Sequence, residues 1–213
     1  MAVLPMFPLG TVLLPSVFLP LHVFEPRYQA LVADCIAGDR EFGVVLIARG
    51  SEVGGGDVRT GVGTIARILE IDALPDGRSQ LLTVGIERIR VVAWLPDDPY
   101  PLADVDPYPD ADAGDGDLVD AVAAVKVRLT RVLALAVELG ATVATLSPEF
   151  SPDASLASFQ ASALAPMGPL DRQRLLAEPS TRSRLGLLDD MLQETEQILA
   201  LQLGDDAGPA DDE

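Results

Sequence analysis

The chain has 213 residues, of which 48% are hydrophobic and 23% are charged, and its formal net charge is −18. This length and composition allow a genuine hydrophobic core in one large domain or two small ones. The single cysteine, Cys35, excludes a disulfide framework and any metal site built from several thiolates. Because the N-terminus also lacks the basic residues of an export signal, we expect a cytoplasmic protein.

The negative charge is concentrated in two segments. Residues 97–120 contain nine acids and no base, and residues 205–213 contain five acids and no base. The rest of the chain is close to neutral. This distribution is typical of solvated connectors and tails, and it argues against binding to nucleic-acid phosphates. We therefore predict that residues 205–213 form a disordered acidic tail.

The chain carries no acidic or basic side chain before Glu25, apart from the neutral His22. Such an apolar start can indicate a membrane span, but a span needs about 18 or more residues of unbroken helix. Prolines at positions 5, 8, 15 and 20 each remove a backbone donor, so no helix can cross this stretch. We predict short extended segments buried in a globular domain, and no membrane association.

A strand followed by a helix is predicted next. In residues 19–24 the apolar Leu19, Leu21 and Val23 alternate with other residues, which indicates a strand with one buried face. Pro26 suits the first turn of a helix whose apolar stripe ends at Ile36. We expect Gly38 to end this helix in the left-handed conformation.

Three further strands are predicted over residues 42–48, 64–71 and 80–94, where apolar residues form a run or alternate. Residues 50–61 include three consecutive glycines, so we expect a mobile surface loop there. The sequence Pro75-Asp76-Gly77 predicts the turn between the last two strands. The first half of the chain is thus expected to be mainly β-structure with one early helix.

Residues 96–116 combine five prolines with acidic residues and no base. We predict an extended, irregular connector with one short edge strand over residues 102–105. Beyond the connector, apolar residues recur at helical spacing and prolines separate the segments. This pattern predicts a small helical bundle with helices over residues 118–140, 155–165, 170–177 and 181–203.

The candidate catalytic and metal-binding residues also have simpler interpretations. His22 is the only histidine, so a Ser-His-Asp or Cys-His arrangement would have to use it. Its place in an alternating strand favours a structural or binding-surface role. Cys35 lies on the apolar stripe of the early helix, where a buried thiol is expected. The acids at positions 110, 112, 115 and 117 could bind calcium weakly, but a solvated linker fits their pattern better.

Glu25, Pro26 and Arg27 occupy the corner between the predicted strand and helix. Glu25 and Arg27 could act as a charged pair that grips the main chain of a ligand. The favoured interpretation is structural: Glu25 caps the helix, and Arg27 pairs locally to fix the corner.

Several motifs resemble the N-terminal substrate-binding domain of the Lon proteases. In the first half they are F-P-L-G-T-V-L-L-P-S-V-F-L-P-L-H-V-F-E-P-R-Y at 7–28, F-G-V-V-L-I at 42–47, G-T-I-A-R-I at 63–68 and L-L-T-V-G-I-E-R-I-R-V at 81–91. In the second half, L-D-R-Q-R-L-L-A-E-P-S-T-R-S-R-L-G-L-L at 170–188 is similar to the helical part of that domain. The resemblance extends from Val3 to Leu203.

The resemblance implies an α+β fold. A PUA-like β pseudo-barrel with one early helix is expected in residues 1–113, with the connector starting near 96, and a helical subdomain in residues 114–204. The chain has no G-x-x-x-x-G-K-[ST] phosphate loop, and Lys126, its only lysine, has no nearby nucleophile for a serine–lysine peptidase. We therefore expect a standalone, non-catalytic recognition domain without an ATPase or peptidase, and without a cofactor or a metal.

By the same resemblance, the expected partners are unfolded or client proteins. The chain would serve as an adaptor for a separate protease or chaperone, or as a holdase for exposed hydrophobic segments. A groove near the N-terminal strands, or between barrel and helices, would offer apolar surface. The candidate peptide-binding residues are Val17, Phe18, His22, Tyr28 and Trp94.

Two alternative functions remain open at this point. A hydrolase would need His22 or a cluster of carboxylates to converge in a pocket. An RNA-binding protein would need a basic stripe, which the arginines at positions 67, 78, 88 and 90 could form on paired strands. The strong negative charge of the chain makes nucleic-acid binding the weaker of these alternatives.

Overall fold

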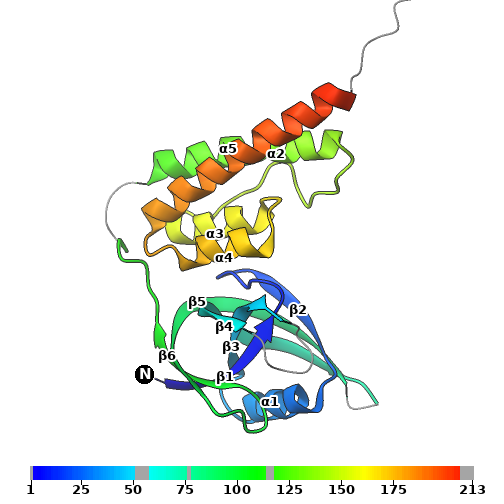
Figure 1. Cartoon of the computed structure of the whole chain (residues 1–213), viewed down its shortest axis with the longest axis vertical. Coiled ribbons are helices and arrows are strands. Elements are labelled where there is room, and N and C mark those ends of the chain that lie inside the picture. The colour runs from blue at the N-terminus through cyan, green and yellow to red at the C-terminus, as the bar shows by residue number, and fades with distance from the viewer. Residues whose placement is uncertain (1, 51–57, 76–77, 114–117, 207–213) are drawn as a thin grey trace, which may run out of the picture. The chain divides into compact units, whose positions relative to one another are not determined.

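The computed structural model describes residues 2–50, 58–75, 78–113 and 118–206. Within these ranges the chain forms six strands and five helices, coloured from the N-terminus to the C-terminus in Figure 1. None of the helices in the described ranges combines the length and hydropathy that a membrane crossing requires.

The chain divides into two compact units. Unit 1 comprises residues 1–109 and 168–177, and unit 2 comprises residues 110–167 and 178–213. The chain first passes from unit 1 to unit 2 between residues 109 and 110, and residues 168–177 belong with the strands rather than with the other helices.

All of the described strands belong to unit 1, and those after β1 confirm the strands predicted from the sequence, whereas only short extended segments were predicted where β1 lies. They are β1 Ala2–Leu9, β2 Phe18–Val23, β3 Glu41–Arg49, β4 Val58–Ala73, β5 Ser79–Leu95 and β6 Leu102–Pro107. The predicted loop over residues 50–61 is wrong for its last part, because β4 already begins at Val58. The glycine run at 54–56 and the turn residues Asp76 and Gly77 lie outside the described residues.

The sheet of unit 1 closes on itself. Its strand order is β2-β5-β4-β3-β1-β6, and β6 pairs additionally with β5. The segment predicted as an edge strand is therefore an interior strand between β1 and β5, which corrects that expectation. Ala103 and Val105 of β6 are buried inside the closed sheet, whereas Asp104 and Asp106 are partly exposed. This alternation allows an acidic segment to complete the barrel.

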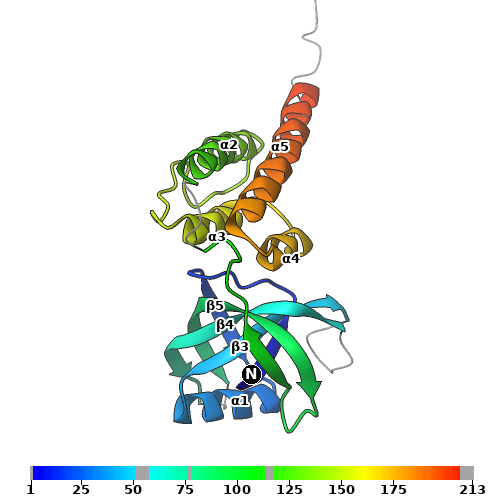
Figure 2. The same cartoon turned by 90° about the vertical axis from the view of Figure 1, so that its left-hand side faces the viewer.

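Helix α1 Pro26–Ala37 lies across one end of this barrel, as both views show (Figures 1 and 2). Its buried residues pack with Phe7 and Phe42 in the main hydrophobic cluster of unit 1. They are Tyr28, Leu31, Val32 and Cys35.

The left-handed end predicted for α1 at Gly38 is wrong. Gly38 has a φ of −111°, and its N–H donates to the Asp34 and Cys35 carbonyls. The positive φ falls instead on Arg40, at 62°, whose N–H donates to the Cys35 carbonyl at 2.9 Å. The reversal into β3 thus occurs two residues later than the glycine indicated.

Helix α4 Pro169–Ala177 is tied to the barrel by a side chain of β5 and by that of Tyr108, the residue after β6. Arg88 donates a hydrogen bond to the Leu176 carbonyl at 2.8 Å, and the Tyr108 hydroxyl donates to the Ala177 carbonyl at 3.1 Å. The last carbonyls of a helix have no partner within the helix, so these bonds satisfy groups that would otherwise need water. They explain why α4 belongs to unit 1.

Unit 2 contains the other three helices, which agree closely with the predicted ranges: α2 Val119–Glu138, α3 Ala154–Leu164 and α5 Thr181–Asp206. Helices α2 and α5 bury apolar faces that include Leu129 and Leu188. At their edge Arg128 donates to Asp189 at 2.7 Å and to Glu196 at 3.2 Å. The unit is thus held by an apolar seam with an ionic network beside it.

The most buried charge among the residues that the structure describes lies in unit 2. The Arg184 side chain has no exposed surface, donates to both Asp110 oxygens at 2.9 and 2.7 Å, and lies over the Phe159 ring. Asp112 accepts hydrogen bonds from the Thr181 and Arg182 amides and so caps α5.

The prediction of a solvated linker is therefore wrong for Asp110 and Asp112, because the start of α5 supplies partners for both carboxylates. The same engagement leaves these two side chains unavailable as a calcium site. Asp115 and Asp117 lie outside the described residues.

The stability of unit 2 is expected to fall in acid because of Asp110. Burial alone would raise the pKa of Asp110, but hydrogen bonds from Arg184, Ser155 and Thr181 and the charge of Arg184 hold this pKa well below its ordinary value. Since the folded pKa is the lower one, this stabilisation is complete above about pH 4 and is lost as the pH falls further. The unfolded chain then binds about one more proton, which corresponds to about 1.4 kcal/mol per pH unit.

Urea unfolding followed by helical circular dichroism between pH 7 and pH 2.5 measures this effect. The Asp110→Asn variant has no carboxylate to protonate at this position, so its stability should vary less steeply with pH below 4. Equal slopes for both proteins in this range would contradict the assignment.

Candidate functional site

The outer edge of strand β2 is open for pairing. β2 lies at the end of the strand order and pairs antiparallel with β5 alone among the described strands. The Val17 carbonyl accepts a hydrogen bond from the Gly85 amide at 3.0 Å, one position before the pair Phe18 and Val84. In an antiparallel ladder this pattern directs the backbone groups of Phe18, Pro20 and His22 away from β5.

The side chains of β2 alternate between two environments. Leu19 and Leu21 are half-buried and Val23 is buried, and all three pack against the main cluster of unit 1. Phe18, Pro20 and His22 are exposed. Phe18 is 62% exposed, and Phe24, directly after the strand, is 54% exposed. Two aromatic rings therefore stand in solvent at the two ends of one short strand.

Two hollows flank β2. The larger, of about 430 Å³, lies over the exposed faces of β2, β5 and β4, and Pro20, His22, Glu70 and Asp72 contribute to its wall. The smaller, of about 210 Å³, lies between β2, the end of β1 and the start of α1. We call residues 17–24 with these two hollows the β2 surface.

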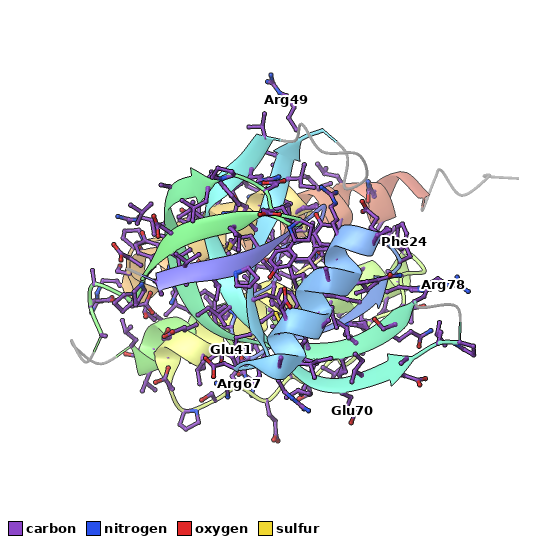
Figure 3. All side chains as sticks on the ribbon, turned by 90° about the horizontal axis from the view of Figure 1, so that it is seen from below. Phe24, Glu41, Arg49, Arg67, Glu70 and Arg78 are labelled. Carbon is purple, nitrogen blue, oxygen red and sulfur yellow. The ribbon has the colours of Figure 1, made fainter. Side chains whose placement is uncertain are left out.

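The charges around the β2 surface are acidic. Glu70 and Asp72 line the larger hollow and Glu25 lines the smaller, and no lysine or arginine is among the described residues that line either one. Figure 3 shows the Glu70 side chain projecting outward from the barrel, and Phe24 beside the first turn of α1. Arg78 lies on the same hairpin as Glu70 but is not part of the wall.

The corner at Glu25, Pro26 and Arg27 is fixed locally. Arg27 Nε donates to Glu25 at 3.1 Å, and the Arg27 guanidinium lies 4.5 Å from the centre of the Tyr28 ring. Pro26 begins α1, as expected, and Glu25 occupies the position before the helix without a side-chain capping bond. The local pairing of Arg27 that the structural interpretation expected is thus present, with Glu25 as the partner, while the cap by Glu25 is not.

The structure brings together Val17, Phe18 and His22 but not all of the candidate binding residues. Tyr28 is only 4% exposed and stacks on Phe7, so it forms the floor of the smaller hollow rather than a free surface. Trp94 pairs with Ala103 of β6, near the other end of β5, and packs beneath Arg59. Trp94 therefore lies away from the β2 surface.

The candidate nucleophile and histidine have ordinary surroundings. Cys35 is buried and donates to the Glu41 carbonyl at 3.2 Å. Burial, reinforced by the charge of Asp34, raises the pKa of this thiol to about 11, so the reactive thiolate is strongly disfavoured at neutral pH. The His22 ring lies edge-on to Phe24, with 6.4 Å between the ring centres.

The four arginines proposed for RNA binding do not form one exposed stripe. Arg88 is only 5% exposed, and the Arg88 and Arg90 guanidiniums both lie over the Tyr108 ring. Arg67 donates to Glu41 at 2.6 Å, and Figure 3 shows these two side chains pointing toward one another. The expectation that the four arginines would share one stripe rested on backbone alternation alone.

Sequence reasoning missed Glu70, Asp72 and the open backbone edge. The two acids belong to β4, which reaches β2 only through β5, and the pairing register that joins them was not visible in the sequence. The alternation in residues 19–24 did indicate which side chains are exposed. It could not indicate that one edge of the strand has no partner.

Comparison with known proteins supplies the family. The family model described as the ATP-dependent protease La (LON) substrate-binding domain matches residues 3–194. The chain belongs to this family. The resemblance to the Lon substrate-binding domain, expected from the motifs, is thereby confirmed.

Curated relatives are Lon proteases. Lon protease 2 of Herpetosiphon aurantiacus is 32% identical over 210 residues, which is 93% of this chain and 24% of that protein. Lon protease 2 of Myxococcus xanthus is 30% identical over 203 residues, with 93% and 24% covered. The chain thus spans about a quarter of the length of the curated relatives it matches.

Solved structures of Lon N-terminal domains share this fold. A Lon N-terminal domain protein from Xanthomonas campestris matches with a TM-score of 0.65 and 30% identity, covering 88% of this chain and 97% of that one. The N-terminal domain of the Mycobacterium avium complex Lon protease matches with a TM-score of 0.63, covering 90% and 98%. Its identity of 17% shows likeness of fold alone.

Proposed function

We propose that this chain is a non-catalytic module that binds exposed apolar segments of unfolded or client proteins at the β2 surface. Its membership of a family described as substrate-binding supports this class of function. The engaged arginines and the buried, protonated Cys35 give no support to RNA binding or to thiol catalysis.

The observation that carries the proposal is the pair of exposed aromatic rings, Phe18 and Phe24, at the ends of β2. Large apolar side chains grouped on a surface mark sites of protein interaction, and aromatic side chains often dominate the binding energy there. Two hollows with apolar residues in their walls adjoin β2, and Phe24 is part of the wall of the smaller one. The β2 surface can therefore take up apolar side chains from another chain.

The binding prediction is tested by replacing Phe18 and Phe24 with serine in one variant. Burial of one phenylalanine contributes about 1.5–3 kcal/mol, so the double variant should bind at least about tenfold more weakly. The probe is fluorescein-labelled lactalbumin that has been reduced and carboxymethylated, and its binding is followed by fluorescence anisotropy.

A matched control is Val127→Ser, which removes an apolar side chain of 54% exposure from α2 in unit 2. This control should bind the probe as the unchanged protein does. Thermal melting of all three proteins shows whether any loss reflects unfolding. An unchanged affinity in the Phe18 and Phe24 variant would refute the proposed site.

We further propose that the module acts in the cytoplasm, either as an adaptor for a separate protease or chaperone or as a holdase. Suppression of aggregation of thermally unfolded citrate synthase by the purified chain alone would favour the holdase. Copurification of one partner with its own ATPase or peptidase, at constant stoichiometry, would favour the adaptor. We also propose that the barrel of unit 1 is PUA-like and that unit 2 is the helical subdomain.

A further inference from the structure

Resting on the binding function proposed above, we propose that a client segment adds to the outer edge of β2 as an extra β-strand. The segment would present alternate side chains to the two faces of the sheet, with basic ones on the face that carries Glu70 and Asp72. Binding would then depend on the client's main chain and on its alternation of side chains, rather than on one fixed sequence.

The backbone of β2 offers the groups that such pairing needs. Phe18 and His22 direct both an amide and a carbonyl outward, and Pro20 directs a carbonyl alone. Proteins usually protect an open edge with charged side chains, bulges or proline. Residues 18–24 contain no lysine, arginine or acid, and Pro20 removes a single donor. This edge is therefore only partly protected against pairing.

The side chains of an added strand would reach two different environments. Successive side chains in a strand point to opposite faces, so one set would stand on the face of the sheet that carries the larger hollow, beside Pro20 and His22, and the other on the side of the smaller hollow. The smaller hollow has apolar walls formed by residues such as Phe7, Leu9 and Leu21. The larger one contains Glu70 and Asp72. Apolar residues alternating with basic ones complement this arrangement.

The charges distinguish the proposed occupant from two others. The acidic segment at 205–213 of this chain has the same sign as Glu70 and Asp72. A second copy would bring its own β2, whose residues 18–24 include no basic side chain. An extended client segment with lysine or arginine at alternate positions is the occupant that the charges favour.

The test uses the full chain and a fluorescein-labelled peptide in which leucine and lysine alternate. Two further peptides carry backbone N-methyl groups, one at every leucine and the other at every lysine. In a strand, alternate amides face the same neighbour, so only one of these peptides loses the bonds to β2. We expect one methylated peptide to bind at least about tenfold more weakly and the other to bind nearly as the unmodified peptide does.

A pair of protein variants tests the same edge of β2, this time by changing the protein rather than the peptide. His22→Pro removes one outward amide that the ladder with β5 does not use, and His22→Ala removes the same side chain but keeps that amide. His22→Pro should bind the peptide several-fold more weakly than His22→Ala. Should His22→Pro fail to fold, hydrogen exchange of the unchanged protein replaces it: the peptide should protect the Phe18 and His22 amides.

The proposed preference for basic side chains is tested with a double variant that combines Glu70→Gln and Asp72→Asn. This variant should lose the preference for the lysine peptide over a peptide with glutamate at the same positions. An unchanged preference would overturn the assignment of basic side chains to this face.

The outcomes separate strand addition from the proposed function. Equal loss for both methylated peptides, with binding still dependent on Phe18 and Phe24, would overturn strand addition and leave the binding function standing. Failure of every unfolded probe to bind would overturn both. Self-association that is abolished by His22→Pro and not displaced by the peptide would show that β2 pairs with a second copy instead.

Discussion

Replacing Arg184 by methionine should destabilise unit 2 by about 3–5 kcal/mol, because removal of one partner of a buried ion pair leaves the other charge without compensation. Arg184 has no exposed surface and makes two bonds to Asp110, as well as one to Ser158 Oγ at 2.7 Å. Methionine fills a similar volume without the charge. Urea unfolding followed by helical circular dichroism gives the change in free energy.

Arg182→Met is the matched control for this experiment. Arg182 lies in the same turn of α5, but its side chain is exposed, so the same replacement should change stability by no more than about 0.5 kcal/mol. A loss for Arg184→Met that is no larger than the loss for Arg182→Met would show that the ion pair does not hold unit 2 together.

Replacing Gly63 by alanine should destabilise the barrel by about 3 kcal/mol, at the upper end of the usual cost of overpacking. A Cβ at Gly63 would overlap the Val44 carbonyl oxygen and would lie 2.7 Å from Val45 Cγ1. The obstructing oxygen belongs to the backbone of β3, which pairs with β4 at this point and cannot move aside independently. Denaturant unfolding followed by Trp94 fluorescence reports on this unit.

Gly61→Ala makes the same change two residues earlier in β4. A Cβ at Gly61 would have no heavy atom within 4 Å from any residue other than its two chain neighbours, so the stability should change by no more than about 0.5 kcal/mol. Equal stability for the two variants would mean that β3 and β4 lie farther apart at Gly63 than the structure describes.

The sequence predicted the elements that depend on local pattern. The alternation in residues 19–24 gave strand β2, and the apolar spacing after residue 118 gave helix α2, since burial on one face repeats at the period of each element. Pairing between distant segments carries no such period. The closure of β6 on β1 and β5 was therefore missed, although the strand itself was foreseen.

The buried charges escaped prediction for a related reason. Asp110 lies in an acidic, proline-rich segment whose composition is that of a solvated linker, and its partner Arg184 is 74 residues away in the sequence. Nothing near either residue in the sequence shows that they meet. For the candidate site, exposure of His22 and Phe24 could be foreseen from alternation, while the open edge of β2 required the complete strand order.

The membership of α4 in unit 1 affects how deletion experiments must be interpreted. The polypeptide passes from one unit to the other at residues 109/110, 167/168 and 177/178, so the sequence of unit 1 is interrupted by a segment of unit 2. A fragment that stops near residue 113 would lack the Leu176 carbonyl and leave the Arg88 guanidinium without that acceptor. Loss of binding in such a fragment would then reflect damage to the barrel. Taking that loss as evidence for a binding site on the helices would be a mistake.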